Sequence, residues 1–282
     1  MRGVCDMHFS SRTCLRALCL VLLLIAGPSW ADFTFVQISD THVGTDQPAF
    51  NARFRKVIEE INALKPDFVI HTGDALTKMT PENVQLFKDL CKSLTVPLYV
   101  VPGNHDIENI RDASISDGEA AVEKWTRDFG KHITIEKEDC LFIGLNSCLY
   151  NSRLPSDVNQ LAWLKTTFAR TQGKRIFIFQ HHPLFIEKPT DPNGDYFAVD
   201  EPMRSTLLSY FRANKVTAVL TGHVHRFLES SFFGIDFIST PAVSFSTARD
   251  EGLTGYRVFH VYKDGFTHTF VELRQKGSPP NF

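Results

Sequence analysis

The chain alternates short apolar runs with longer stretches in which apolar residues recur at helical spacing. The short runs are rich in β-branched and aromatic residues, which is typical of buried strands. They predict strands at residues 33–38, 68–70, 98–101, 176–179 and 216–220. The longer stretches predict helices at residues 49–64, 84–94, 157–171 and 203–213. After residue 225, shorter apolar runs predict further strands at 227–233, 235–239, 256–262 and 266–271. This order predicts an α/β fold with a group of antiparallel strands at the end.

A short polar block follows each of the first five predicted strands. The blocks are Asp-Thr-His (40–42), Gly-Asp (73–74), Gly-Asn-His-Asp (103–106), His-His-Pro (181–183) and Gly-His-Val-His (222–225). In open α/β sheets, ligands bind in the crevice outside the carboxyl ends of the strands. We therefore expect the five blocks to converge on one site.

The spacing within the blocks indicates metal binding. Asp40 and His42 alternate along a strand end, as do His223 and His225, so each pair can point to one side. A single Asp-x-His or Gly-Asp sequence also occurs at ordinary turns, and the inference depends on the whole set. Mixed oxygen and nitrogen donors suit Mn, Fe or Zn, and the order of affinities does not choose among these three.

The order and spacing of the five blocks resemble the calcineurin-like metallophosphoesterase superfamily, from residue 40 to residue 225. The resemblance implies a four-layer αββα sandwich of two mixed sheets flanked by helices. Three further features resemble the calcineurin-like phosphoesterase domain-containing phosphatases, which are thought to act on phosphoserine and phosphothreonine. These features are residues 179–185, the Tyr196-Phe197 pair, and Arg226.

The resemblance also implies how the polar residues divide between two metal ions. By this pattern the first ion is bound by Asp40, His42 and His225, the second by Asn104, His181 and His223, and Asp74 bridges both. His181 rather than His182 is the expected ligand, because the family's histidine normally lies two residues before the proline. Thr77 stands where many relatives have an acidic or tyrosine residue, which argues against an iron–tyrosinate site of the purple acid phosphatase type.

The expected mechanism follows from these assignments. Two ions about 3.5–4 Å apart can hold a bridging hydroxide as the nucleophile and orient a phosphate ester between them. His105 has no metal to bind in this pattern, so it is expected to protonate the leaving alkoxide or to stabilise its charge. Asp106 either orients His105 or caps a following helix. Arg226 either holds a phosphate oxygen or is a solvated surface residue.

A polar insertion at residues 184–202 follows His181, and long loops of this kind often act as lids. Tyr196 on this loop either binds the substrate by stacking or covers the edge of the sheet. The sequence does not choose between an open groove for a phosphoprotein and a closed pocket for a small ester.

Residues 1–31 have the pattern of a signal peptide. Arginines at 2, 12 and 16 precede an apolar run at 17–26, and small Ser29 and Ala31 indicate cleavage before Asp32. The run is short for a bilayer crossing, which needs about 20 residues. We therefore expect an exported protein, periplasmic or secreted, with an uncleaved membrane anchor as the alternative. The catalytic domain is expected at 32–275, followed by a polar tail at 276–282.

Charge limits the partners that we expect, and cysteine spacing limits the disulfides. Without the leader the chain is mildly acidic, so it lacks the basic footprint of a nucleic-acid binder. No stable membrane partner is expected. Of the three cysteines outside the leader, Cys140 and Cys148 are separated by an extended run too long for a disulfide. The expected partner is a phosphorylated substrate, either a small molecule or a phosphoprotein.

Three functions are compatible with the sequence. The first is metal-dependent hydrolysis of phosphate monoesters, including serine/threonine protein phosphatase activity. The second is phosphodiester hydrolysis of a cyclic nucleotide or glycerol-type diester, because the same pair of ions serves both reactions. The third is a catalytically silent metal-containing binding module, against which the presence of His105 and all seven predicted ligands argues.

Overall fold

The structure is a computed structural model that describes residues 32–107, 110, 113–171, 173–247 and 252–273. The predicted leader and the whole of the predicted tail lie outside the described residues. The helices are α1 (Pro48–Leu64), α2 (Pro81–Cys91), α3 (Ile115–Phe129), α4 (Pro155–Ala169) and α5 (Met203–Ala213), with a 3-10 turn at Ser147–Leu149. Among the described residues, no helix is both long and apolar enough to cross a membrane.

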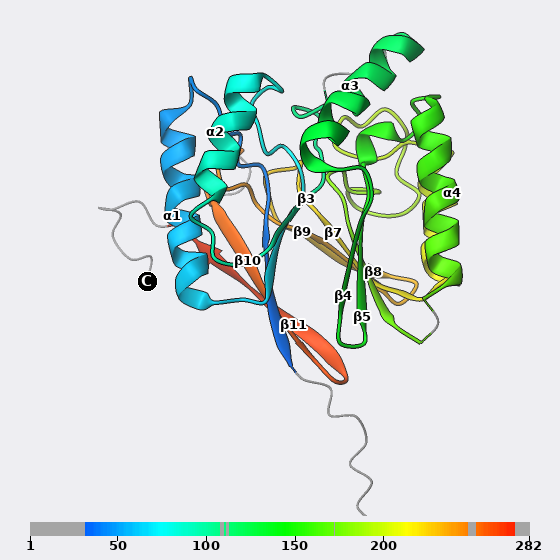
Figure 1. The fold of residues 1–282 in the computed structure, drawn as a ribbon. Helices are drawn as coiled ribbons and strands as arrows, with labels where there is room; N and C mark the ends of the chain where they lie inside the picture. The colour runs from blue at the N-terminus through cyan, green and yellow to red at the C-terminus, as the bar shows by residue number, and fades with distance from the viewer. Residues whose placement is uncertain (1–31, 108–109, 111–112, 172, 248–251, 274–282) are drawn as a thin grey trace, which may run out of the picture.

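Two mixed sheets form the centre of the fold (Figure 1). The first has the order β11 (Gly265–Glu272), β10 (Gly255–Tyr262), β1 (Phe33–Ile38), β2 (Phe68–His71), β3 (Leu98–Val100). The second has the order β4 (Ile133–Lys137), β5 (Cys140–Gly144), β6 (Arg175–Phe179), β7 (Val216–Thr221), β9 (Ile235–Ser239), β8 (Leu228–Phe232). The C-terminal strands are thus shared between the sheets, and β9 pairs parallel to β7, which corrects the expectation of a purely antiparallel group.

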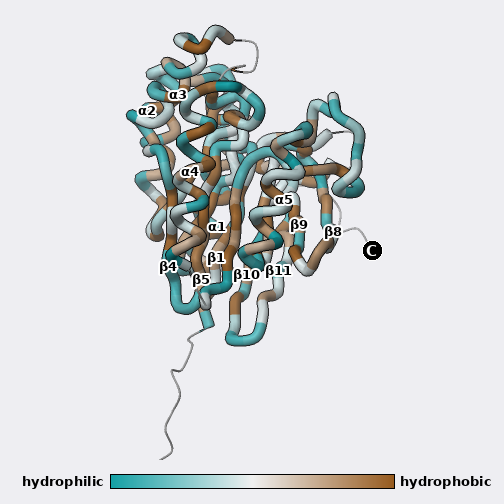
Figure 2. Tube along the Cα trace, turned by 90° about the vertical axis from the view of Figure 1, so that its right-hand side faces the viewer, coloured by the Kyte–Doolittle hydropathy of each residue, from teal (hydrophilic) through white to brown (hydrophobic). Residues whose placement is uncertain are grey.

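The four-layer sandwich expected from the sequence is confirmed. Successive side chains of a strand point to opposite faces, so each apolar strand packs on two sides. In β1, Phe33 and Phe35 contact the second sheet, whereas Val36 and Ile38 pack in the cluster that contains α1 and α2. The outer face of the second sheet packs against α4 and α5. Figure 2 shows the hydrophobic residues concentrated along the central strands and the hairpin turns coloured hydrophilic.

The layer between the sheets is built mainly from phenylalanines. The ring of Phe35 stacks on that of Phe259 with centroids 4.5 Å apart, and meets Phe142 of the other sheet edge-on at 4.9 Å. These rings are fully buried and interdigitate across the sheet interface. The apolar layer fixes the two sheets against each other, and with them the strand ends that carry the polar blocks.

Local signals set the helix boundaries. Proline occupies the first turn of α1, α2 and α4, where its missing N–H costs nothing. The hydroxyl of Thr80 accepts a hydrogen bond from the Asn83 amide, so α2 begins at Pro81. The sequence pattern did not predict α3, β4 or β5.

The five predicted strands carry their polar blocks to the same edge. The pairs β1–β2, β2–β3 and β6–β7 are parallel, which places their carboxyl ends together. Beyond the strands the backbones remain bonded: the Asp40 amide donates to the Gly73 carbonyl at 3.0 Å, and Gly222 to His181 at 3.0 Å. The blocks therefore begin from a rigid edge rather than from free loops.

Candidate metal centre

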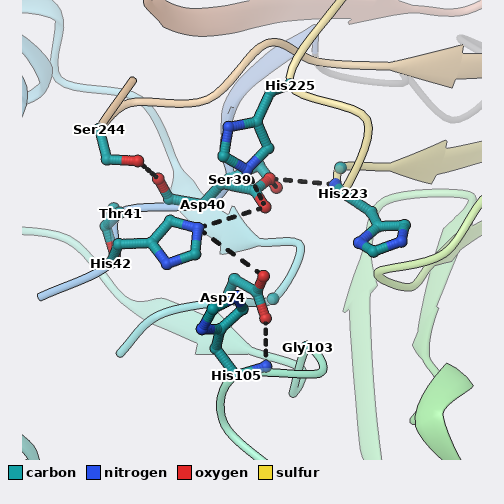
Figure 3. Close-up of polar contacts among 12 residues, drawn as sticks. Ser39, Asp40, Thr41, His42, Asp74, Gly103, His105, His223, His225 and Ser244 are labelled. Atoms are coloured by element: carbon teal, nitrogen blue, oxygen red, sulfur yellow. Dashed lines mark hydrogen bonds and ion pairs between the residues drawn. The ribbon is translucent and has the colours of Figure 1, made fainter. Parts of the chain in front are cut away.

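Three side chains form the first buried group: Asp40, His42 and His225. Their ligand atoms lie within 4.8 Å of one another. The Asp40 Oδ1 atom is 3.1 Å from His225 Nε2 and 4.0 Å from His42 Nε2 (Figure 3). All three residues are buried, so the group is shielded from bulk water.

The second carboxylate oxygen of Asp40 is already occupied. Oδ2 accepts a hydrogen bond from the Ser39 hydroxyl and another, at 3.1 Å, from the His223 amide. The hydroxyl of Ser244 also donates to the Asp40 carbonyl at 2.6 Å. These contacts orient the carboxylate so that Oδ1 faces the two imidazoles.

Asp74 lies between the first group and a second one. Its Oδ1 accepts a hydrogen bond from the His105 amide at 2.8 Å. Its Oδ2 is 3.7 Å from His42 Nε2 on one side and 3.3 Å from His181 Nε2 on the other. One oxygen of Asp74 therefore faces histidines of both predicted ion sites.

The second group contains His181, Asn104 and His223. The Asn104 Oδ1 atom lies 3.1 Å from His181 Nε2. The rings of His181 and His223 have their centroids 4.7 Å apart. The structure thus brings all seven predicted ligands into two adjoining groups that meet at Asp74.

Backbone carbonyls hold the imidazoles. His181 Nδ1 lies 2.8 Å from the Thr72 carbonyl, and His225 Nδ1 lies 2.9 Å from that of Phe245. A carbonyl only accepts, so the facing nitrogen carries a proton, and the other nitrogen is the one available to a metal ion. Metal-binding histidines usually donate their second ring N–H in this way, which fixes the tautomer.

The electrostatics of the site favour a bound cation. Burial lowers the pKa of His42 and that of His223 to about 4, which keeps both imidazoles neutral and able to donate a lone pair. Burial acts in the same direction on His181, but Asp74 and Asp40 overcome it and raise the pKa of His181 to about 9. The buried carboxylates therefore attract positive charge to the point between the two groups.

Two buried atoms fit the same conclusion. Asp40 Oδ1 and His42 Nε2 have no hydrogen-bond partner although both are inaccessible to water. A buried polar atom without a hydrogen-bond partner destabilises the folded state. Both atoms can instead bind a divalent transition-metal ion through a lone pair. The residues present therefore fit metal binding at this site.

The comparison with protein families agrees with this geometry. The family model described as calcineurin-like phosphoesterase matches residues 33–227, which include all five polar blocks. The chain belongs to the calcineurin-like phosphoesterase family. Its class of reaction is therefore the hydrolysis of phosphate esters, and members of the family bind divalent metals.

Individual relatives carry different names. The serine/threonine-protein phosphatase CPPED1 of Homo sapiens is 30% identical over 241 residues, which cover 79% of this chain and 74% of that protein. A probable glycerophosphodiester phosphodiesterase, GpdQ of Arcobacter nitrofigilis, is 31% identical over 230 residues, covering 76% and 80%. A dimetal phosphatase from Danio rerio has the same fold, with a TM-score of 0.64, 14% identity and coverage of 84% and 95%.

In this member of the calcineurin-like phosphoesterase family, His105 lies at the exposed side of the site. Its ring meets that of His42 edge-on, with centroids 4.7 Å apart. Its Nδ1 is 3.1 Å from the Thr77 carbonyl, which leaves Nε2 for other partners. The position suits a group that exchanges a proton with a substrate beside the metal ligands.

The structure corrects the prediction for Asp106. Its carboxylate accepts hydrogen bonds from the backbone amides of Gly103 at 2.9 Å, Ala75 at 3.0 Å and Leu76 at 2.8 Å. Asp106 therefore joins two ligand-bearing loops, whereas it is the Thr77 carbonyl that lies 3.1 Å from the His105 ring nitrogen Nδ1. Nor does it cap the next described helix, because Ser114 caps α3. Burial, followed by the charge of Asp74, raises the pKa of Asp106 to about 7.

The remaining predicted residues have different placements. Tyr196 lies against the second group: its hydroxyl accepts a hydrogen bond from Asn104 Nδ2 at 3.2 Å. His182 contacts the His223 ring with centroids 4.3 Å apart, and its Nδ1 is 2.8 Å from the Ser147 hydroxyl. Arg226 is partly exposed after His225, and its role in phosphate binding stays a prediction.

The backbone at the site is unusual. Five of the predicted ligands adopt positive φ, a conformation uncommon for residues other than glycine. They are Asp40 (52°), His42 (45°), Asp74 (53°), His223 (67°) and His225 (51°). Such conformations persist where the surrounding structure enforces them, and they are concentrated at functional sites.

Sequence reasoning missed several residues that hold the ligands. Ser39 and Ser244 fix Asp40, and the carbonyls of Thr72 and Phe245 fix two imidazoles. Buried His71 links the loops of Asp40 and Asp74, because its Nε2 lies 2.9 Å from the Thr41 hydroxyl and its Nδ1 accepts a hydrogen bond from the Gly73 amide at 3.2 Å. A carbonyl contact has no side-chain signature, so only Ser39, directly before Asp40, carried a local signal.

Proposed function

We propose that the chain is a dinuclear metal-dependent phosphatase that hydrolyses phosphate monoesters. The observation that supports this most strongly is the position of Asp74 Oδ2 between His42 and His181. One carboxylate oxygen can bind two ions only if it lies between the ligands of the first ion and those of the second. Asp74 Oδ2 has such a position, with His42 on one side and His181 on the other. The exposed His105 beside this point supports catalytic turnover rather than a silent metal-containing binding module.

The two ions would be held by the seven buried or half-buried ligands named above. Bound ions of this kind activate water and neutralise charge on a phosphate ester. His105 would donate a proton from Nε2 to the leaving oxygen, while the Thr77 carbonyl holds its Nδ1. Asp106 would hold the loop of Asp74 against the loop of Asn104 through its hydrogen bonds with three backbone amides.

Two relatives bear on the substrate class. Similarity to CPPED1 supports a phosphoserine or phosphothreonine substrate. We also propose that residues 1–31 direct export, and an exported enzyme is better suited to releasing phosphate from small esters than to regulating intracellular phosphoproteins. The comparable similarity to GpdQ keeps a phosphodiesterase as the second candidate.

The test is hydrolysis of nitrophenyl phosphate and bis-nitrophenyl phosphate by metal-stripped protein reconstituted separately with Mn, Fe and Zn. Turnover of the monoester that disappears in Asp74→Asn is expected, and the most active ion identifies the working metal. Preference for the bis-ester would favour the phosphodiesterase. No turnover of either compound with any of the metals would favour a silent metal-binding module.

A further inference from the structure

Beside Phe197, whose ring centroid lies 5.5 Å from that of His223, the loop at residues 184–202 contacts the second ligand group through Tyr196. Its side-chain hydroxyl accepts a hydrogen bond from Asn104 Nδ2 at 3.2 Å. Its backbone carbonyl lies 3.1 Å from His223 Nε2. Two ligands that come from different strands are thus held by one residue of a third segment.

Each of these two Tyr196 contacts determines which atom of the ligand faces the second metal site. Because the Tyr196 hydroxyl takes up the amide N–H of Asn104, the amide is oriented with its oxygen toward His181. Because the Tyr196 carbonyl only accepts, His223 carries its proton on Nε2 and presents Nδ1 as a lone pair. If the Asn104 amide were flipped, or if the proton of His223 moved to Nδ1, an N–H would take the place of the metal-binding atom.

The loop is itself held firmly enough to carry this function. Arg204 is buried and donates to the Asp191 carbonyl at 2.6 Å and to Glu201 Oε1 at 3.2 Å. The Asp200 carboxylate accepts the Gly194 amide at 2.7 Å. Residues on both sides of Tyr196 are therefore bonded, which fixes its position against the second group.

We propose that Tyr196 is a positioning residue for the second metal ion, acting on Asn104 through its hydroxyl and on His223 through its carbonyl. This differs from a substrate-stacking role and rests on the proposed dinuclear function. Groups that orient metal ligands typically change metal affinity by about 10–100-fold when they are removed. The tyrosine hydroxyl is one of two contacts, so its loss belongs at the lower end of that range.

The test compares Tyr196→Phe with the unmodified protein by calorimetric titration of the metal-free forms with Mn²⁺. We expect two Mn²⁺ per chain in both, with the dissociation constant of the second ion raised about tenfold in Tyr196→Phe and the first unchanged. At limiting Mn²⁺, the electron paramagnetic resonance signal of coupled Mn²⁺ pairs should be weaker in Tyr196→Phe than in the unmodified protein. Tyr196 is 64% exposed and the change removes one oxygen atom, so the fold is preserved.

Kinetics separate positioning from substrate contact. Saturating Mn²⁺ should restore the turnover of Tyr196→Phe, with KM unchanged. The proposal is overturned by an unchanged second-ion affinity, or by a raised KM that persists at saturating metal. Tyr262→Phe, the same chemical change on the remote β10–β11 hairpin, is the matched control. If the unmodified protein binds only one Mn²⁺, the dinuclear function fails, independently of Tyr196.

Discussion

Asp40 Oδ1 lies 4.0 Å from His42 Nε2, and both atoms are buried without a hydrogen-bond partner. A metal ion between them would satisfy both, so metal binding should stabilise the folded protein. Binding to the folded state alone adds about 2.7 kcal/mol at a ligand concentration of 100 Kd. For a domain of this size, that raises the Tm by roughly 5–11 °C.

Thermal unfolding in Mn²⁺ and in a chelator measures this shift. His42→Ala should reduce it strongly, because it removes a ligand of the first ion. Mg²⁺ should give a smaller shift, since it prefers oxygen ligands to imidazole. Equal Tm values with Mn²⁺ and with chelator would contradict metal binding at this site.

His105→Ala should lower kcat by about 10²–10⁴-fold, as expected for the loss of a general acid. The reduction should be greater for phenyl phosphate than for nitrophenyl phosphate, because the poorer leaving group depends more on protonation. Metal content should be unchanged. Loss of an ion would instead identify His105 as a ligand, which its position within 4.8 Å of His42 and Asp74 also allows.

Gly222→Ala should disturb the first ligand group. An added Cβ would lie 1.8 Å from the Ser39 hydroxyl oxygen and 2.6 Å from Asp40 Oδ2, so the carboxylate must move. We expect a loss of about 1–3 kcal/mol in urea unfolding, together with weaker Mn²⁺ binding. Gly265→Ala is the control, because its Cβ would meet only the Tyr262 ring at 3.4 Å. Equal Mn²⁺ affinity in the two variants would refute the proposed crowding.

Asp157 should make stability depend on pH. Burial raises its pKa from 3.8 to about 6, and its Oδ1 is buried without a partner. The folded state therefore binds a proton that the unfolded state has released. This contribution to stability is complete below about pH 4 and is lost as pH rises through 6. Asp157→Asn should be more stable than the unmodified protein at pH 8, with the difference disappearing toward pH 4, as urea unfolding at several pH values would measure.

The sequence predicted the elements that carry strong periodicity. The bounds of β1, β9 and α5 agree with the prediction, and the other predicted helices and strands differ by a few residues at their ends. The segment that contains α3 and β4 was not predicted. The buried residues of α3, Gly118, Val122 and Trp125, do follow helical spacing, so this helix was missed although its pattern is present; β4 is an edge strand with a mixed pattern, so its hydrophobic signal is weak.

The sequence by itself determined which residues meet at the site, because parallel strands must end at one edge and each polar block follows such a strand. Only the tertiary structure decided which atoms they present. The contact of Asp74 with the His105 amide, the contacts of Asp106 with Ala75 and Leu76, and the contact of Tyr196 with Asn104 join residues 30 to 92 positions apart. Such hydrogen bonds are set by the packing of the two sheets and by backbone carbonyls and amides, which every residue carries alike, and so they leave no pattern in the order of side chains.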